Sequence, residues 1–151
     1  MTPETSIHVL HAAAEFQGLA KTGGLADMVA ALTRAQIAVG INVRVCVPAY
    51  SGTREKLLRP VVVARLQVRR YSVTIFEGCL AHNAPCIWLV DCPSLFNRGT
   101  DPYRDVYGAE FGDSALRFGI FSEAVAQLAL GAAGWQPDVV HLHDWHTGLA
   151  A

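Results

Sequence analysis

Two short segments of the chain combine residue types that suit a negatively charged ligand. The first, EFQGLAKTGGLAD at residues 15–27, places Lys21 just before Gly23 and Gly24 at the expected start of a helix. The first turn of a helix has backbone N–H groups without internal partners and carries partial positive charge. The segment therefore predicts a phosphate site, and a sugar diphosphate is a ligand that would suit it.

The second segment, HLHDWHTG at residues 141–148, combines histidines with Asp144 and Trp145. His141 and His143 share one face if they lie on a strand, and imidazole is a common zinc ligand. A binuclear hydrolase would show H-x-H-x-D-H, however, whereas this chain has H-x-H-D-x-H. We favour buried, hydrogen-bonded histidines and predict no metal, with a zinc-dependent hydrolase as the alternative.

Known nucleotide motifs do not describe the first segment. A P-loop places its lysine after the glycines, and the dinucleotide fingerprint G-x-G-x-x-G is absent. No cofactor is therefore predicted. The simplest alternative is a tight turn in which glycine supplies special dihedral angles and Lys21 is solvated, with Glu15 as a surface charge and Asp27 as a first-turn helix acid.

Composition limits the class of protein. The chain has 151 residues, 52% of them hydrophobic, and a net charge of -1. These values predict one globular domain that binds neither nucleic acid nor an anionic membrane. No run reaches the roughly 18 apolar residues of a membrane span. The four cysteines lack C-x-x-C pairs, so we expect reduced thiols in a cytoplasmic protein.

Hydrophobic patterns predict the elements that position both segments. Residues 7–13 and 43–47 read as strands around a helix over 25–39, which implies a parallel pair with a right-handed crossover. Three β-rich runs within residues 61–91 suggest antiparallel or mixed strands. Residues 92–112 form a long loop by composition, followed by a helix to about residue 130 that Asp113 caps. Residues 137–143 then form a further strand.

This order places both segments after strands. Ligands of open α/β sheets bind beyond the carboxyl ends of the strands, where strand order reverses. We therefore expect the two segments to share one cleft. On the long loop, Arg98 and Arg104 are most simply solvated, although either would meet a phosphate bound there.

Several motifs together resemble bacterial glycogen synthase and plant starch synthase. The resemblance spans nearly the whole chain in the same order. Its members are the strand at residues 7–13, KTGGLAD at 21–27, PAY at 48–50, Asp113 with LRF at 116–118, and PDVVHLHDWHTGL at 137–149. The resemblance implies an α/β, Rossmann-like fold: a mostly parallel sheet with helices on both faces and an antiparallel β insertion, forming the N-terminal half of a glycosyltransferase with two Rossmann-like domains.

The resemblance also implies an activity, a retaining transfer of glucose from ADP-glucose to the non-reducing 4-hydroxyl of an α-1,4-glucan such as glycogen. Lys21 resembles the family lysine near the donor diphosphate, and Gly23 and Gly24 permit close backbone approach. Asp144 resembles the active-site aspartate beside the transferred glucose, and Trp145 borders the acceptor.

Other positions resemble the family less completely. Glu15 and Asp27 match acidic positions near the first loop, whereas Ser114 stands where the family often has asparagine. The family continues past the counterpart of Ala151 with an active-site histidine loop and a second domain. We expect residues 1–151 to be an incomplete N-terminal domain that does not turn over alone; the alternative is a stand-alone module that binds nucleotide sugar or glucan without catalysis.

Overall fold

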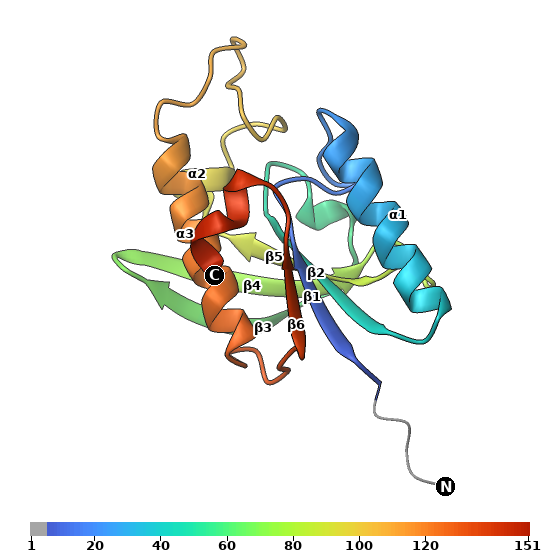
Figure 1. Ribbon diagram of the computed structural model, residues 1–151. Helices are drawn as coiled ribbons and strands as arrows, with labels where there is room; N and C mark the ends of the chain where they lie inside the picture. The colour runs from blue at the N-terminus through green and yellow to red at the C-terminus, as the bar shows by residue number, and fades with distance from the viewer. Residues whose placement is uncertain (1–5) are drawn as a thin grey trace, which may run out of the picture.

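The computed structural model describes residues 6–151 as a six-stranded mixed sheet flanked by helices (Figure 1). The strand order is β3-β4-β5-β2-β1-β6. The strands are β1 (His8–Ala12), β2 (Asn42–Pro48), β3 (Leu58–Val68), β4 (Tyr71–Cys79), β5 (Cys86–Asp91) and β6 (Val139–Leu142). The predicted α/β class is confirmed.

The direction of the chain reverses beside β1. From β1 the chain passes through α1 (Gly24–Ala38) to β2 on one side. From β5 it passes through α2 (Pro93–Phe96) and α3 (Ser114–Ala129) to β6 on the other side. Because parallel crossovers are right-handed, opposite directions put α1 and α3 on opposite faces of the sheet, as Figure 1 shows. The switch point of the fold thus lies between the paired strands β1 and β6, at their carboxyl ends.

Strands β3, β4 and β5 form the predicted antiparallel insertion. The antiparallel pairs are β3 with β4 and β4 with β5, whereas β5, β2, β1 and β6 pair in parallel. The central parallel strands are largely apolar because helices cover both faces of the sheet. Their fully buried side chains include Leu10, Val45, Ile87 and Leu89. This rigid centre positions the loops at its carboxyl edge.

Two local predictions need correction. The stretch over residues 92–112 is not loop throughout, because α2 begins at Pro93, a residue whose fixed φ suits the first turn of a helix. Asp113 precedes α3, but its side chain makes no capping hydrogen bond. The Asp113 carboxylate instead accepts a charge-assisted hydrogen bond from Arg98 at 2.6 Å, so its partner lies outside the helix.

Short 3₁₀ helices complete the described chain: η1 (Arg54–Lys56) and η2 (Trp145–Ala150). Within residues 6–151, no helix combines the length and apolarity needed to cross a bilayer. The four cysteines are free thiols, and Cys46 and Cys92 are buried.

Candidate functional site

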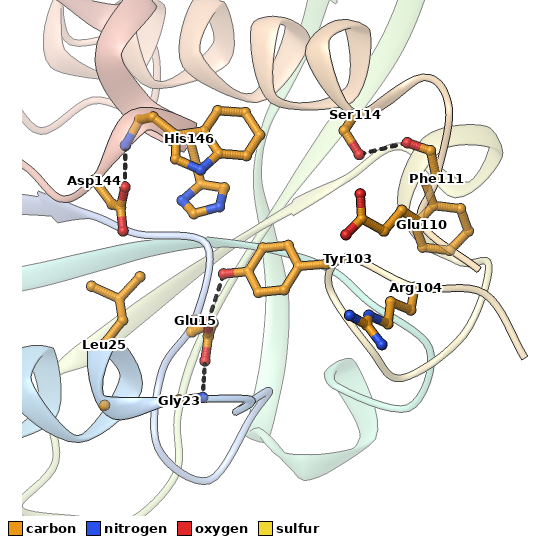
Figure 2. A pocket seen from close by; sticks show the side chains of 12 residues that line it. Glu15, Gly23, Leu25, Tyr103, Arg104, Glu110, Phe111, Ser114, Asp144 and His146 are labelled. Atoms are coloured by element: carbon orange, nitrogen blue, oxygen red, sulfur yellow. Dashed lines mark hydrogen bonds between the residues drawn. The ribbon is translucent and has the colours of Figure 1, made fainter. Parts of the chain in front are cut away.

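A pocket of about 680 Å³ lies at the switch point and joins the two segments singled out in the sequence (Figure 2). Glu15 and Gly23 come from the loop after β1, Gly24 begins α1, and Asp144 and Trp145 follow β6. The expectation of a shared cleft is therefore met by the structure. The remaining lining residues are Leu25, Tyr103, Arg104, Glu110, Phe111, Ser114 and His146.

Glu15 is a buried carboxylate that holds the loop before α1 in shape. It accepts hydrogen bonds from the Thr22 N–H at 2.7 Å, the Thr22 hydroxyl at 2.9 Å and the Gly23 N–H at 3.3 Å. The Tyr103 hydroxyl donates a fourth at 2.6 Å. Burial alone would raise the pKa of Glu15, but these hydrogen bonds outweigh it and lower the pKa. Glu15 is therefore a charged, structural acceptor and not a surface charge.

Gly23 and Gly24 do not provide special dihedral angles. Gly23 has φ -146°, and Gly24 begins α1. A Cβ atom built on either residue meets no atom within 4 Å outside its chain neighbours and its own helix. The tight-turn explanation for this glycine pair is therefore wrong. Both residues line the pocket, so a bare backbone there leaves room for a ligand to approach the N-terminal end of α1.

Asp144 adopts a backbone conformation that non-glycine residues avoid. Its φ is 63° and its ψ is 178°, a combination that costs about 1–3 kcal/mol. The Asp144 carboxylate accepts a hydrogen bond from the Trp145 N–H at 2.6 Å (Figure 2). The chain turns sharply from β6 into η2 at this residue, which leaves the carboxylate exposed at the pocket wall. Strain of this kind is characteristic of functional sites.

Aromatic rings form the wall between the two segments. Tyr103 stacks on His146 with ring centroids 5.1 Å apart, and Phe118 meets His146 edge to face at 4.7 Å. His146 is buried, and burial lowers its pKa, so the imidazole is neutral near pH 7. Neither Tyr103 nor His146 was among the residues predicted for the site. His146 lay within the HLHDWH segment, which was a usable signal; Tyr103 lay in a loop without one.

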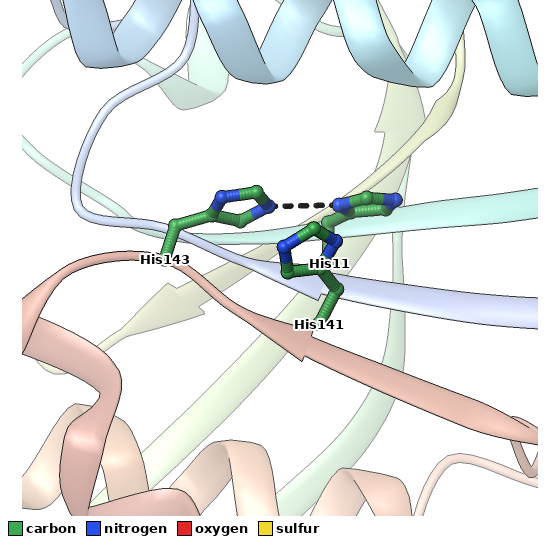
Figure 3. Close-up of side chains that lie close together, drawn as sticks. All are labelled: His11, His141 and His143. Atoms are coloured by element: carbon green, nitrogen blue, oxygen red, sulfur yellow. Dashed lines mark hydrogen bonds between the residues drawn. The ribbon is translucent and has the colours of Figure 1, made fainter.

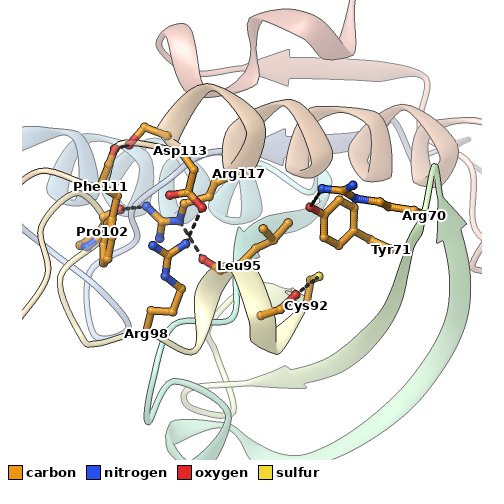
Figure 4. Close-up of polar contacts among 11 residues, drawn as sticks. Arg70, Tyr71, Cys92, Leu95, Arg98, Pro102, Phe111, Asp113 and Arg117 are labelled. Atoms are coloured by element: carbon orange, nitrogen blue, oxygen red, sulfur yellow. Dashed lines mark hydrogen bonds and ion pairs between the residues drawn. The ribbon is translucent and has the colours of Figure 1, made fainter.

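A buried arginine fixes the loop that carries Tyr103 (Figure 4). Arg117 of α3 donates to the carbonyl oxygens of Leu95 at 2.7 Å and Pro102 at 3.0 Å. Its guanidinium lies 4.1 Å from the centre of the Phe111 ring, a cation–π contact. Arg98 pairs with Asp113 and does not line the pocket. Of the two loop arginines, it is Arg104 that lines the pocket.

Lys21 and Asp27 lie beside the pocket without lining it. The Lys21 ammonium pairs with the Asp27 carboxylate at 2.6 Å, and both side chains are about half exposed. An exposed ion pair contributes only about 0–1 kcal/mol, so separating the two groups costs little. The structure thus brings Glu15, Gly23, Gly24, Asp144 and Trp145 together and leaves Lys21 and Asp27 at the margin.

The pocket lining has more carboxylates than cations, which disfavours a diphosphate ligand. The carboxylates of Glu15, Glu110 and Asp144 face a single guanidinium, that of Arg104, within the described chain. The first turn of α1 adds partial positive charge but no full cation. A bound diphosphate would therefore need cations that do not line the pocket. Lys21 is a candidate because it lies two residues before the lining residue Gly23.

The site and the fold define a class of protein, an α/β domain with its pocket at the switch point of a mostly parallel sheet. The family model for the starch synthase catalytic domain matches residues 8–151, and the chain belongs to this family.

Curated relatives agree with this assignment. The chain is 46% identical to the glycogen synthase of Burkholderia thailandensis over 143 residues, which cover 92% of this chain and 27% of that protein. It is 42% identical to the glycogen synthase of Thioalkalivibrio sulfidiphilus over 149 residues, which cover 95% and 31%. The chain thus spans about a third or less of the length of these relatives.

A solved structure shares the fold. The catalytic domain of starch synthase IV from Arabidopsis thaliana, bound to ADP and acarbose, superposes with a TM-score of 0.79 at 28% identity. The match covers 97% of this chain and 29% of that one. The predicted resemblance to glycogen and starch synthases is therefore confirmed.

Proposed function

We propose that the switch-point pocket is one wall of a site that transfers glucose from ADP-glucose to the non-reducing 4-hydroxyl of an α-1,4-glucan. The observation that carries this proposal is the pair Gly23 and Gly24. The backbone does not need glycine there, yet both residues line the pocket at the N-terminal end of α1. The arabidopsis relative was solved with ADP and acarbose, ligands that correspond to a nucleotide product and an oligosaccharide.

The diphosphate of the donor then lies against the first turn of α1, where N–H groups and the helix dipole favour anions. Lys21 leaves Asp27 and pairs with the phosphate, since the exposed Lys21–Asp27 pair is weak. As ADP departs, negative charge grows on its phosphate. Lys21 and the oriented N–H groups therefore stabilise the transition state more than they stabilise the bound donor.

Asp144 serves the glucose end of the donor. Its strained backbone exposes the carboxylate at the pocket wall, where it balances the positive charge that develops on the sugar during transfer. Trp145 is largely exposed beside it and offers an apolar ring to the glucan acceptor. In this assignment Glu15 is a positioning residue that acts through the loop it holds.

We further propose that residues 1–151 alone bind ADP-glucose weakly and do not transfer glucose. Three lining carboxylates oppose a diphosphate that Arg104 alone cannot neutralise. Positioning the donor and excluding water also need groups on both sides of a cleft. The relatives are more than three times as long as the matched region, which leaves ample chain to supply the other wall.

The test uses the purified 151-residue chain. Calorimetry with ADP should show saturable binding that Lys21→Ala weakens about tenfold, as expected for one lost charge-assisted contact of roughly 1.4 kcal/mol. The control Arg65→Ala removes an exposed cation on β3, across the sheet, and should bind ADP like the parent chain. Incubation with labelled ADP-glucose and glycogen should leave the label unincorporated. Glucan elongation would overturn the inactivity proposal, and absence of ADP binding at millimolar concentration would overturn the assignment of the pocket.

A further inference from the structure

Three histidines converge on the face of the sheet that α1 covers (Figure 3). His11 of β1 and His141 of β6 are direct partners in the parallel register. His143 lies two residues after His141 and so points to the same face. One ring nitrogen from each histidine lies within 4.8 Å of those of the other two. None of the three is among the residues that line the described pocket.

The hydrogen bonds define which nitrogen of His11 carries a proton. The Nε2 atom of His11 lies 2.7 Å from the Gln36 side-chain oxygen of α1. An amide oxygen only accepts, so Nε2 of His11 is the donor and Nδ1 carries a lone pair. That Nδ1 atom lies 2.9 Å from Nε2 of His143, which therefore donates to it. His11 thus directs a lone pair toward the other histidines while a side-chain oxygen holds its N–H, the arrangement typical of a metal-binding histidine.

We propose that His11, His141 and His143 bind a divalent transition-metal cation of the zinc type, with Gln36 as the outer partner that orients His11. Three neutral imidazoles with an open fourth position are an established donor set for zinc. On binding, His143 moves its proton from Nε2 to Nδ1, and the ion replaces the hydrogen bond between His11 and His143. No electron transfer or covalent bond is involved, and water fills the fourth position.

Access and location support the site. His11 and His143 are buried, whereas His141 is exposed on β6, the edge strand of the sheet. An ion can therefore reach the two buried histidines from the solvent side, next to the exposed His141 ring, which stacks on His143 with ring centroids 4.1 Å apart. Once bound, the ion would join β1 to β6, the two strands that lead into Glu15 and Asp144. The inference concerns binding alone and does not depend on the proposed glucosyltransferase activity.

Zinc chloride titrated into the chelator-treated 151-residue chain at pH 7.5 tests the proposal by calorimetry. We expect one zinc per chain. His141→Ala should weaken binding by at least about 100-fold, since losing a ligand exceeds the 10- to 100-fold cost of losing an outer partner. Gln36→Leu should weaken it about tenfold for that outer contact. His141 is the chosen ligand because its side chain is exposed, so its removal spares the core.

His82→Ala is the matched control, because His82 is exposed and lies beside Cys79 in a separate surface hollow. Its zinc affinity should equal that of the parent chain. Cobalt substitution provides a second measurement, since a four-coordinate cobalt centre with histidine ligands absorbs strongly in the visible range. Absence of one-to-one binding, unchanged affinity in His141→Ala, or loss of binding in His82→Ala would each overturn the proposal.

Discussion

The Tyr103 hydroxyl donates a 2.6 Å hydrogen bond to the Glu15 carboxylate and joins two loops that lie 88 residues apart in the chain. The same carboxylate accepts the N–H groups of Thr22 and Gly23. One buried acid therefore links the loop before α1 to the loop between α2 and α3, and both loops line the pocket. This connection, together with the Arg117 hydrogen bond to the Pro102 carbonyl, helps set the shape of the pocket.

Tyr103→Phe tests this connection. The substitution keeps the ring but removes one of the four hydrogen bonds that Glu15 accepts, so the free energy of unfolding should fall by about 1–2 kcal/mol. The pKa of Glu15 should rise, because a bond that favours its charged form is lost. Urea unfolding and a carboxylate NMR titration measure the two effects. Tyr107→Phe is the matched control, since Tyr107 is 91% exposed on the same loop. Equal stability of the two variants would contradict the role given to Tyr103.

Gly24→Ala separates the two explanations of the glycine pair. Alanine fits the helical backbone, so the free energy of unfolding should be unchanged or raised by up to about 1 kcal/mol. ADP affinity should fall, because the added methyl group projects into the space that the ligand needs. Calorimetry and urea unfolding measure both quantities, and Gly148→Ala, another open position outside the pocket, is the control. A destabilised variant with unchanged ADP affinity would restore the tight-turn explanation.

Asp144 offers a test of strain at the site. Asp144→Gly relieves the unfavourable φ, whereas Asp144→Ala keeps it, and both remove the carboxylate and its bond to Trp145. The glycine variant should be about 1–2 kcal/mol more stable than the alanine variant in urea unfolding. Both should lose affinity for ADP-glucose relative to ADP. If the alanine variant proves as stable as the glycine variant, the backbone at this position is not strained.

The histidines predict how stability depends on pH. Burial, with help from neighbouring histidines, lowers the pKa of His143 to about 4, and burial lowers the pKa of His11 as well. In the unfolded chain both groups titrate near pH 6.5, so below that pH the unfolded state binds more protons than the folded state. The free energy of unfolding should therefore be highest above pH 6.5 and should fall as the pH drops toward 4. His143 accounts for up to about 3 kcal/mol of this fall.

Urea unfolding between pH 7.5 and pH 5 measures this dependence before most carboxylates titrate. His143→Gln places an amide near the position of Nε2 and should flatten the profile. His82→Gln changes an exposed histidine and should leave the profile as it is in the parent chain. A profile with the same slope in His143→Gln and in the parent chain would show that His143 does not carry the effect.

The sequence predicted the strands and the helix that position the site better than it predicted the residues that line the pocket. The strands β1 and β6 and the helix α1 follow from local hydrophobic patterns, and their parallel order places both polar segments at one edge. Tyr103 was missed because its position depends on contacts with residues elsewhere in the chain, such as Glu15, which is 88 residues away. Arg117 draws the carbonyl of Pro102 toward α3, and no local pattern encodes that contact.

Two local interpretations that relied on residue type alone were wrong. Asp113 was expected to cap α3 because its residue type favours that role, but the nearby Arg98 guanidinium is a stronger partner. Gly23 and Gly24 were considered as turn residues because glycine commonly has positive φ, yet neither has a positive φ here. The Arg98 side chain decided the first case and the backbone path before α1 decided the second, and a single sequence shows neither.

The most direct test of the account is a titration of the isotope-labelled 151-residue chain with ADP, followed by amide chemical shifts. The account predicts that the largest changes occur in both segments at once. They should occur at Gly23, just before α1, at Gly24, the first residue of α1, and at Trp145, after β6. Changes confined to one loop, or centred on the separate hollow near Gly52 and Asp91, would contradict the claim that the two segments form a single nucleotide-sugar site.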